Sequence, residues 1–253
     1  MQKTYPFRTR FGADIVTEFL PPVRHSNKVV ILTAGCPGYP GGKETLMHLL
    51  ASRGYWSFVP RYRGTWESGG TFLEYAPNED VIAVMDGMQE EFYDLWSGSE
   101  YRVQNPEIYL IGGSFGGAAA LLASRDPRVK KAATISAVVD WKKQEQTLEP
   151  LHLMSEYVPQ AFGQGYRSDP SVWMKLAAGG FYNPEEEKES IDGKKLLMIH
   201  AKNDMVVHFA PALEFAKSVG AQFVALSYDG HMGVGAAGEP KLFRRIEKFF
   251  RTK

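Results

Sequence analysis

A serine placed between glycines is the feature of this sequence with the clearest chemical meaning. Ser114 stands within Gly-Gly-Ser-Phe-Gly at 112–116, after the apolar run 107–111 and before the alanine-rich run 117–123. The first run predicts a buried strand, and the second predicts a helix packed closely on a sheet. A serine on such a strand-to-helix turn presents its hydroxyl, and flanking glycines avoid clashes that side chains would cause there. Ser114 is therefore the candidate nucleophile.

The base that this serine needs is predicted from the order of residues along the chain. A serine hydroxyl attacks only when a base takes its proton and a carboxylate orients that base. In sites built on this kind of turn, the acid follows the serine along the chain and the histidine comes last. Of the six histidines, His231 is the one that follows a late predicted strand, at 223–227, and precedes the final helix. We predict that His231 is the base.

Two aspartates compete for the role of the acid. Asp204 lies in the loop after the predicted strand 195–200, and Asp140 ends the predicted strand 132–139. The stretch from Asp204 to His231 holds one predicted helix and one predicted strand, which is the content of a single αβ unit. We favour Asp204 for this reason and keep Asp140 as the alternative.

A site of this kind also needs two backbone N–H groups that face the oxygen on which negative charge develops. The first is expected from Phe115, the residue after the nucleophile, at the start of a helix whose dipole favours negative charge. The second is expected from the loop after the predicted strand 29–32, either from Gly35 or from Cys36, with Cys36 preferred. Pro37 has no N–H to donate.

The remaining segments predict how these residues are positioned. Apolar runs that alternate with helical patterns indicate a mostly parallel sheet of about eight strands, flanked by helices on both faces. The expected strands are 5–10, 15–20, 29–32, 55–59, 107–111, 132–139, 195–200 and 223–227. Between these strands we expect helices at 44–53, from Asn78 as N-cap to about Leu95, and at 117–123, 211–219 and 241–250.

One segment departs from this alternation. Residues 141–193 are too long for a simple connection and are predicted to form a short helical lid within a single domain of residues 1–253. An insertion at this place lies over the carboxyl edge of the sheet, so some of its aromatic residues are candidates for binding a substrate. Trp141 and Trp173 are our choices, although most such residues must form the core of the insertion itself.

Composition excludes several classes of function. Lysine and arginine total 29, as do aspartate and glutamate, and no basic stripe argues for a nucleic acid partner. The single cysteine fits a reducing compartment, and no N-terminal signal or membrane-spanning run appears, so we expect a cytoplasmic protein without a membrane partner. No metal-ligating cluster or nucleotide-binding motif is found, so we expect no metal and no cofactor. The sequence is compatible with a homo-oligomer.

Four stretches resemble the α/β-hydrolase superfamily and, more narrowly, the catalytic domain of the prolyl oligopeptidase family and its esterase relatives. Residues 60–70, Pro-Arg-Tyr-Arg-Gly-Thr-Trp-Glu-Ser-Gly-Gly, look like the Y-R-G-S loop of that family. Residues 112–117 are similar to its G-x-S-x-G-G turn, and 139–141 to the start of its late insertion. Residues 197–204, followed by His231, resemble its acid and base segments. The similarity covers about residues 28–250 and implies an α/β-hydrolase fold with serine hydrolase chemistry.

Two departures from the family pattern bear on the substrate. The peptidases usually carry His-Gly-Gly-Pro at the oxyanion loop, where this chain has Ala34-Gly35-Cys36-Pro37. They also usually carry an N-terminal β-propeller, for which 253 residues leave no room. The expected function is therefore hydrolysis of small to medium carboxylic esters through an acyl-enzyme. The alternative is a serine peptidase or amidase, and a third hypothesis is a non-catalytic binding protein, which the presence of all three residues disfavours.

Overall fold

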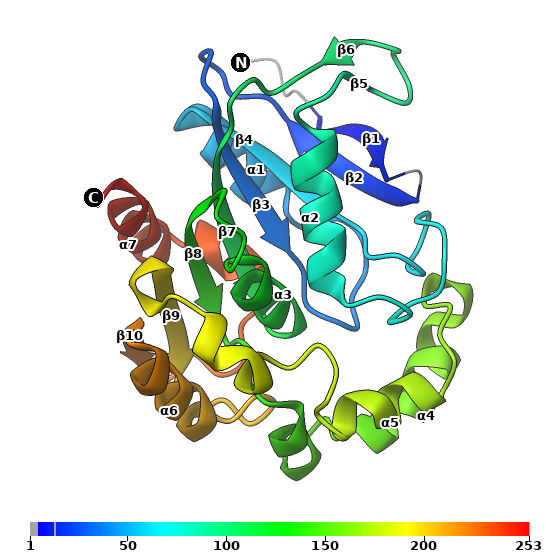
Figure 1. Ribbon diagram of the computed structural model, residues 1–253, viewed down its shortest axis with the longest axis vertical. Helices are drawn as coiled ribbons and strands as arrows, with labels where there is room; N and C mark the ends of the chain where they lie inside the picture. The colour runs from blue at the N-terminus through cyan, green and yellow to red at the C-terminus, as the bar shows by residue number, and fades with distance from the viewer. Residues whose placement is uncertain (1–4, 13, 253) are drawn as a thin grey trace.

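A computed structural model, which describes residues 5–12 and 14–252, shows one eight-stranded sheet at the centre of the chain (Figure 1). The strand order is β1-β2-β4-β3-β7-β8-β9-β10. The first hairpin is antiparallel and β2 pairs antiparallel with β4, whereas all other neighbours are parallel. The strands are β1 Phe7–Phe11, β2 Ile15–Leu20, β3 Lys28–Thr33, β4 Tyr55–Pro60, β7 Glu107–Gly113, β8 Val129–Ile135, β9 Leu196–Ala201 and β10 Gln222–Leu226. The predicted mostly parallel sheet is confirmed.

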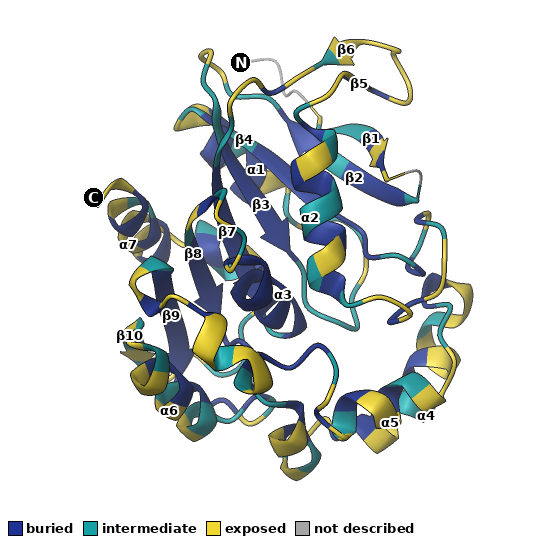
Figure 2. Cartoon of the chain, viewed as in Figure 1, coloured by how far each residue is buried: buried dark blue, intermediate teal, exposed yellow. Residues whose placement is uncertain are grey.

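Helices cover both faces of the sheet because its central strands are apolar on both sides. In β3, Val29 and Ile31 join the core on one face, whereas Val30 and Leu32 join the core on the other. The first face is covered by α2 Pro77–Gly87, α3 Phe115–Ala123 and α6 Phe209–Val219, and the second by α1 Glu44–Ser52 and α7 Pro240–Arg251. Figure 2 shows the result, with the central strands largely buried and the outer helices α2, α6 and α7 exposed on one side. Among the described residues, no helix is both long and apolar enough to cross a membrane.

The prediction for the second helix was wrong at both ends. The helix is capped by Ala76 rather than Asn78, since Pro77 occupies the first helical position, where its missing N–H costs nothing. It ends at Gly87 rather than near Leu95. The chain then turns into a two-stranded sheet of β5 Phe92–Tyr93 and β6 Glu100–Tyr101, which lets Phe92 pack its ring edge against Phe11. Aromatic packing therefore ends the helix early.

The segment between β8 and β9 is largely helical, with η1 Trp141–Gln146, α4 Leu151–Phe162, η2 Gly163–Gly165, α5 Ser171–Ala177, η3 Pro184–Ser190 and η4 Gly193–Lys195. Its helices α4 and α5 lie beyond the carboxyl ends of the central strands (Figure 1). Three backbone hydrogen bonds join it to the loop after β4. Trp66 N donates to Gly165 O at 2.9 Å, Arg167 N to Gly64 O at 2.8 Å, and Phe72 N to Arg167 O at 2.7 Å. The segment is thus fastened to the loop that begins at Arg61.

Gly64 is the residue of this loop that tolerates substitution least. Its φ is +75°, and a Cβ there would lie 1.8 Å from Phe72 N. We expect Gly64→Ala to lower the free energy of unfolding by roughly 3 kcal/mol, because backbone must move to make space. Gly54→Ala is the matched control, since Gly54 has φ +85° but open space around it and should lose only about 1–2 kcal/mol from conformational strain. Denaturant titration of both variants measures the difference, and equal losses would contradict the steric argument.

Candidate active site

Ser114 is held in a strained backbone conformation at the turn between β7 and α3. Its φ is +54° and its ψ −124°, a region that side-chain-bearing residues rarely occupy. Backbone hydrogen bonds to the end of β8, to α3 and to the loop after β8 hold it there. Ser114 N donates to Ile135 O at 3.0 Å, and Ser114 O accepts from Gly117 N at 2.9 Å and Val138 N at 3.2 Å. The hydroxyl is therefore fixed in position by backbone bonds on both sides of the turn.

The structure brings Ser114, His231 and Asp204 into one row of hydrogen bonds. His231 Nε2 lies 3.0 Å from Ser114 Oγ, and His231 Nδ1 lies 2.9 Å from Asp204 Oδ2. A carboxylate can only accept, so Nδ1 carries the proton and Nε2 is left to accept from the serine hydroxyl. Asp204 follows β9, and His231 follows β10. The carboxyl ends of these parallel strands lie at the same edge of the sheet as the end of β7, which explains the meeting of three distant residues.

Asp204 is buried but remains ionised. Its side chain is fully inaccessible, and Oδ1 accepts from Val206 N at 3.0 Å and from Val207 N at 2.9 Å. Burial disfavours the carboxylate, but hydrogen bonds from His200, His231 and Val207 outweigh it and hold the pKa of Asp204 well below its usual value. The negative charge next to the His231 ring therefore persists at neutral pH.

Sequence reasoning missed His200 as a neighbour of this carboxylate. The buried His200 ring places Nε2 2.8 Å from Val207 O and 3.4 Å from Asp204 Oδ2. A histidine within the apolar strand 196–201 was the available signal, because a buried polar ring requires a hydrogen-bond partner.

Asp140, the competing acid, has different partners. Its Oδ1 accepts from Lys142 N at 3.1 Å and from Asn183 Nδ2 at 3.2 Å. It caps η1 in this way, which is a common role for an aspartate at the start of a helical turn. The geometry therefore places Asp204, and not Asp140, against His231.

Backbone N–H groups are available beside Ser114. Phe115 begins α3, and within residues 5–12 and 14–252 its N–H, like those of Gly35 and Cys36, donates to no protein group. Gly35 lies against the serine, since a Cβ on it would be 3.3 Å from Ser114 Cβ. Phe115 and the loop of Gly35 and Cys36 thus lie beside Ser114, and both loop amides stay candidates for the second donor.

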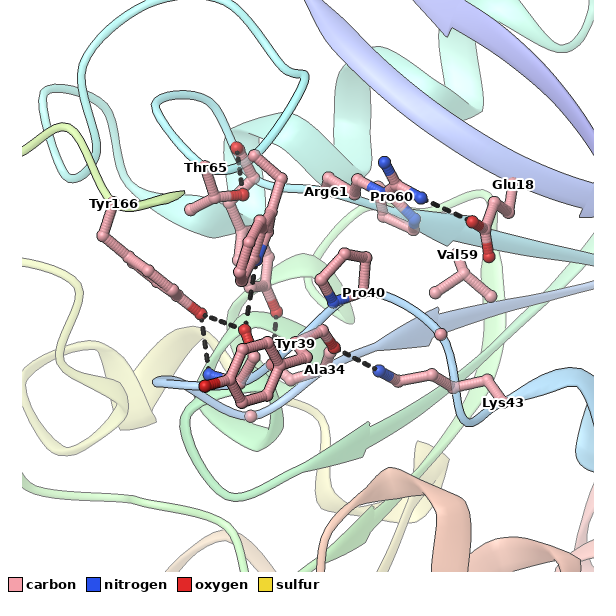
Figure 3. A pocket seen from close by; sticks show the side chains of 15 residues that line it. Glu18, Ala34, Tyr39, Pro40, Lys43, Val59, Pro60, Arg61, Thr65 and Tyr166 are labelled. Atoms are coloured by element: carbon pink, nitrogen blue, oxygen red, sulfur yellow. Dashed lines mark hydrogen bonds and ion pairs between the residues drawn. The ribbon is translucent and has the colours of Figure 1, made fainter. Parts of the chain in front are cut away.

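A small pocket adjoins this loop, with a free volume of about 40 Å³ (Figure 3). Its charged wall is formed by Arg61, which pairs with Glu18 at 2.5 Å and also with Glu67. Other lining residues are Gly35, Gly38, Tyr39, Lys43, Trp66 and Tyr166. Within the described ranges, no group of three or more His, Cys, Asp or Glu side chains is arranged to hold a metal ion.

The two tryptophans predicted to contact substrate are packing residues in this structure. Trp141 is 3% exposed and Trp173 is 2% exposed. The Trp141 ring packs against both Phe115 and Tyr182 and donates its Nε1–H to Tyr182 O. Trp173 packs against Phe72. Neither indole presents a surface that a substrate could reach, because both complete the core beneath the insertion.

The thiol of Cys36 is expected to be unreactive although it lies in the oxyanion loop. Burial raises the pKa of this thiol far above its usual value, so almost no thiolate exists at neutral or mildly alkaline pH. We expect slow alkylation by iodoacetamide at pH 8 in the folded protein. We also expect Cys36→Ala to keep hydrolytic activity, since the substitution retains the backbone N–H. Rapid alkylation that abolishes activity in the native protein but spares Cys36→Ala would contradict this.

Solved structures with a similar fold include both esterases and a peptidase. An esterase from Pyrococcus furiosus superposes with a TM-score of 0.67 at 17% identity, covering 98% of this chain and 89% of its own. Est1E from Butyrivibrio proteoclasticus, with ferulic acid bound, gives 0.62 at 16% identity, covering 95% and 98%. An acylaminoacyl peptidase from Pyrococcus horikoshii gives 0.65 at 17% identity and covers 97% of this chain. This chain spans only 40% of that peptidase.

No curated protein sequence matches the chain significantly. A family model does match, and it covers residues 43–253, which include the loop after β4, the strained serine turn, Asp204 and His231. The chain therefore belongs to the prolyl oligopeptidase family, a family of hydrolases with the α/β-hydrolase fold.

Proposed function

We propose that this protein is a serine esterase that hydrolyses carboxylic esters of small to medium acyl groups. The observation that carries the proposal is the unbroken row of hydrogen bonds from Ser114 through His231 to Asp204. A buried, ionised carboxylate orients an imidazole, and that imidazole faces the hydroxyl of a serine on a strained turn. These are the parts that nucleophilic acyl transfer requires.

The first half of the reaction makes an acyl-enzyme. His231 Nε2 accepts the hydroxyl proton as Ser114 Oγ forms a bond to the acyl carbon, and the carbonyl π electrons move onto its oxygen. That oxygen faces the N–H of Phe115 and of Gly35 or Cys36, at the positive end of α3. As the C–O bond to the alcohol breaks, the imidazolium gives its proton to the leaving oxygen. Asp204 stays ionised and stabilises the imidazolium meanwhile.

The second half returns the free enzyme. Water gives a proton to His231 Nε2 while its oxygen bonds to the acyl carbon, and the same N–H groups face the oxyanion. The bond to Ser114 Oγ then breaks, the serine regains its proton from the imidazolium, and the carboxylic acid leaves. No external oxidant or metal enters either half.

One observation favours an ester over a peptide substrate. The oxyanion loop, Ala34-Gly35-Cys36-Pro37, lacks the His-Gly-Gly-Pro sequence usual in the family's peptidases. Membership of the prolyl oligopeptidase family supports the alternative, a peptidase or amidase that uses the same three residues.

Substrate preference and the role of Ser114 can be tested together. We expect p-nitrophenyl acetate and butyrate to be cleaved faster than acyl-aminoacyl and prolyl p-nitroanilides. Ser114→Ala should lower kcat by about 10⁶-fold, because no nucleophile remains. A fluorophosphonate probe should label the native protein and not the variant, as read by intact mass. Faster cleavage of the anilides would favour the peptidase, and full activity in Ser114→Ala would refute the proposal.

If Asp204 is the acid, its substitution should lower kcat, whereas substitution of Asp140 should not. Asp204→Asn should lower kcat by about 10⁴-fold, because an amide in this position favours the wrong tautomer of His231. Asp140→Asn is the matched control and should leave kcat unchanged, since Asp140 caps η1 instead. Steady-state kinetics on one ester, with thermal melting to show that both variants fold, measures this. The reverse pattern would reassign the acid to Asp140.

A further inference from the structure

The loop that carries the second oxyanion donor is held by side chains from distant parts of the chain. Tyr62 hydroxyl donates to Ala34 O at 2.9 Å, and Trp66 Nε1–H donates to Gly38 O at 3.1 Å. The hydroxyl of Tyr166, which lies 128 residues further along the chain than Gly38, makes two bonds. It accepts from Gly38 N at 2.9 Å and donates to Gly38 O at 3.1 Å (Figure 3). Among the residues that the structure describes, Tyr166 is the one residue of the insertion that hydrogen-bonds to Gly38.

Gly38 in turn lies beside the peptide that joins Gly35 to Cys36. The position that a Gly38 Cβ would take lies 3.4 Å from Gly35 O. The peptide between Gly35 and Cys36 is planar and trans, so its carbonyl and the Cys36 N–H point in opposite directions. A fixed Gly38 therefore limits the space into which the Gly35 carbonyl can turn, and with it the rotation of the Cys36 N–H.

Tyr166 is built to make these bonds permanently. Its side chain is buried, and its ring packs edge-on against Phe72, Trp66 and Phe162. Burial raises the pKa of its hydroxyl well above the usual value, so the group is protonated and can donate at neutral pH. Packing holds the Tyr166 ring in place, and the hydroxyl holds the loop through its hydrogen bonds to Gly38.

We propose that Tyr166 is a positioning residue that aligns the oxyanion loop through its two hydrogen bonds to Gly38. This inference rests on the proposed function, because it assumes that the loop amides face a tetrahedral intermediate. Tyr166 touches neither the substrate nor the reacting atoms in this account. It acts on the reaction only through the orientation of the peptide at Gly35 and Cys36.

Tyr166→Phe removes the hydroxyl and keeps the ring. We expect kcat on p-nitrophenyl butyrate to fall by about 10-fold with KM nearly unchanged. This is less than the 10²–10³-fold cost of deleting an oxyanion donor outright, since Trp66 still holds Gly38. Affinity for an alkyl trifluoromethyl ketone, which forms a tetrahedral adduct with the serine, should fall by the same factor as kcat/KM. Tyr157→Phe, at an exposed tyrosine of α4, is the matched control and should change neither quantity.

The alternative outcomes are distinct. Tyr166→Phe with native kcat and native affinity for the ketone would overturn the proposal. Equal losses of affinity for the ketone and for the carboxylate product would also overturn it, since a loosened site weakens both. Activity is expressed per folded molecule, with the folded fraction taken from thermal melting, so that unfolding does not contribute to the measured loss.

Ser114→Ala, measured alongside, separates failure of the proposed function from failure of the role of Tyr166. Its full activity refutes the proposed function, whereas its inactivity beside an unaffected Tyr166→Phe refutes only the role of Tyr166.

Discussion

Direct contact between backbones, with no side chain in between, is the constraint on which the whole site depends. A Cβ on Gly116 would lie 2.2 Å from Thr33 O, and a Cβ on Gly113 would lie 2.3 Å from Val234 N. These two close contacts between backbones fix the positions of other segments as well as the turn at Ser114. The first places the end of β3, and hence the loop that follows it, beside Ser114. The second places the segment that follows His231 against the end of β7. The steric requirement for glycine at these two positions thus sets the places of Ser114, of the loop after β3 and of the loop that carries His231 together.

Asp204 lies at the far end of the row of hydrogen bonds that starts at Ser114. Its negative charge depends on the hydrogen bonds that its carboxylate accepts. A carboxylate taken out of water would normally become protonated, and a neutral Asp204 would hold the imidazole less firmly. Donors from His231, from the Val206 and Val207 amides and from His200 prevent this. The Val206 and Val207 amides belong to the tight turn after β9, His200 belongs to β9 itself, and His231 belongs to the loop after β10. The ionised carboxylate beside His231 is therefore a consequence of the fold.

Some of this arrangement could be predicted from the sequence, and the reason is the parallel sheet. Loops after parallel strands meet at one edge, so the chain order of Ser114, Asp204 and His231 was enough to select three residues that the structure brings together. Boundaries and side-chain roles were harder to predict. The early end of α2 follows from the packing of Phe92 on Phe11, and the burial of Trp173 follows from its contact with Phe72. Such contacts between distant segments leave no periodic signal in the sequence.

The insertion between β8 and β9 is better understood as a fixed wall than as a moving lid. Opening it would break the backbone bonds to Gly64, Trp66 and Phe72, as well as the bond of 2.7 Å from Tyr182 hydroxyl to Phe115 O. The last of these attaches the insertion to the helix that begins directly after Ser114. Displacement would therefore disturb the turn at Ser114 as well as the neighbouring loop after β3, which Tyr166 of the insertion holds at Gly38. The hydrogen bonds that fasten the insertion are thus part of what keeps the site in place.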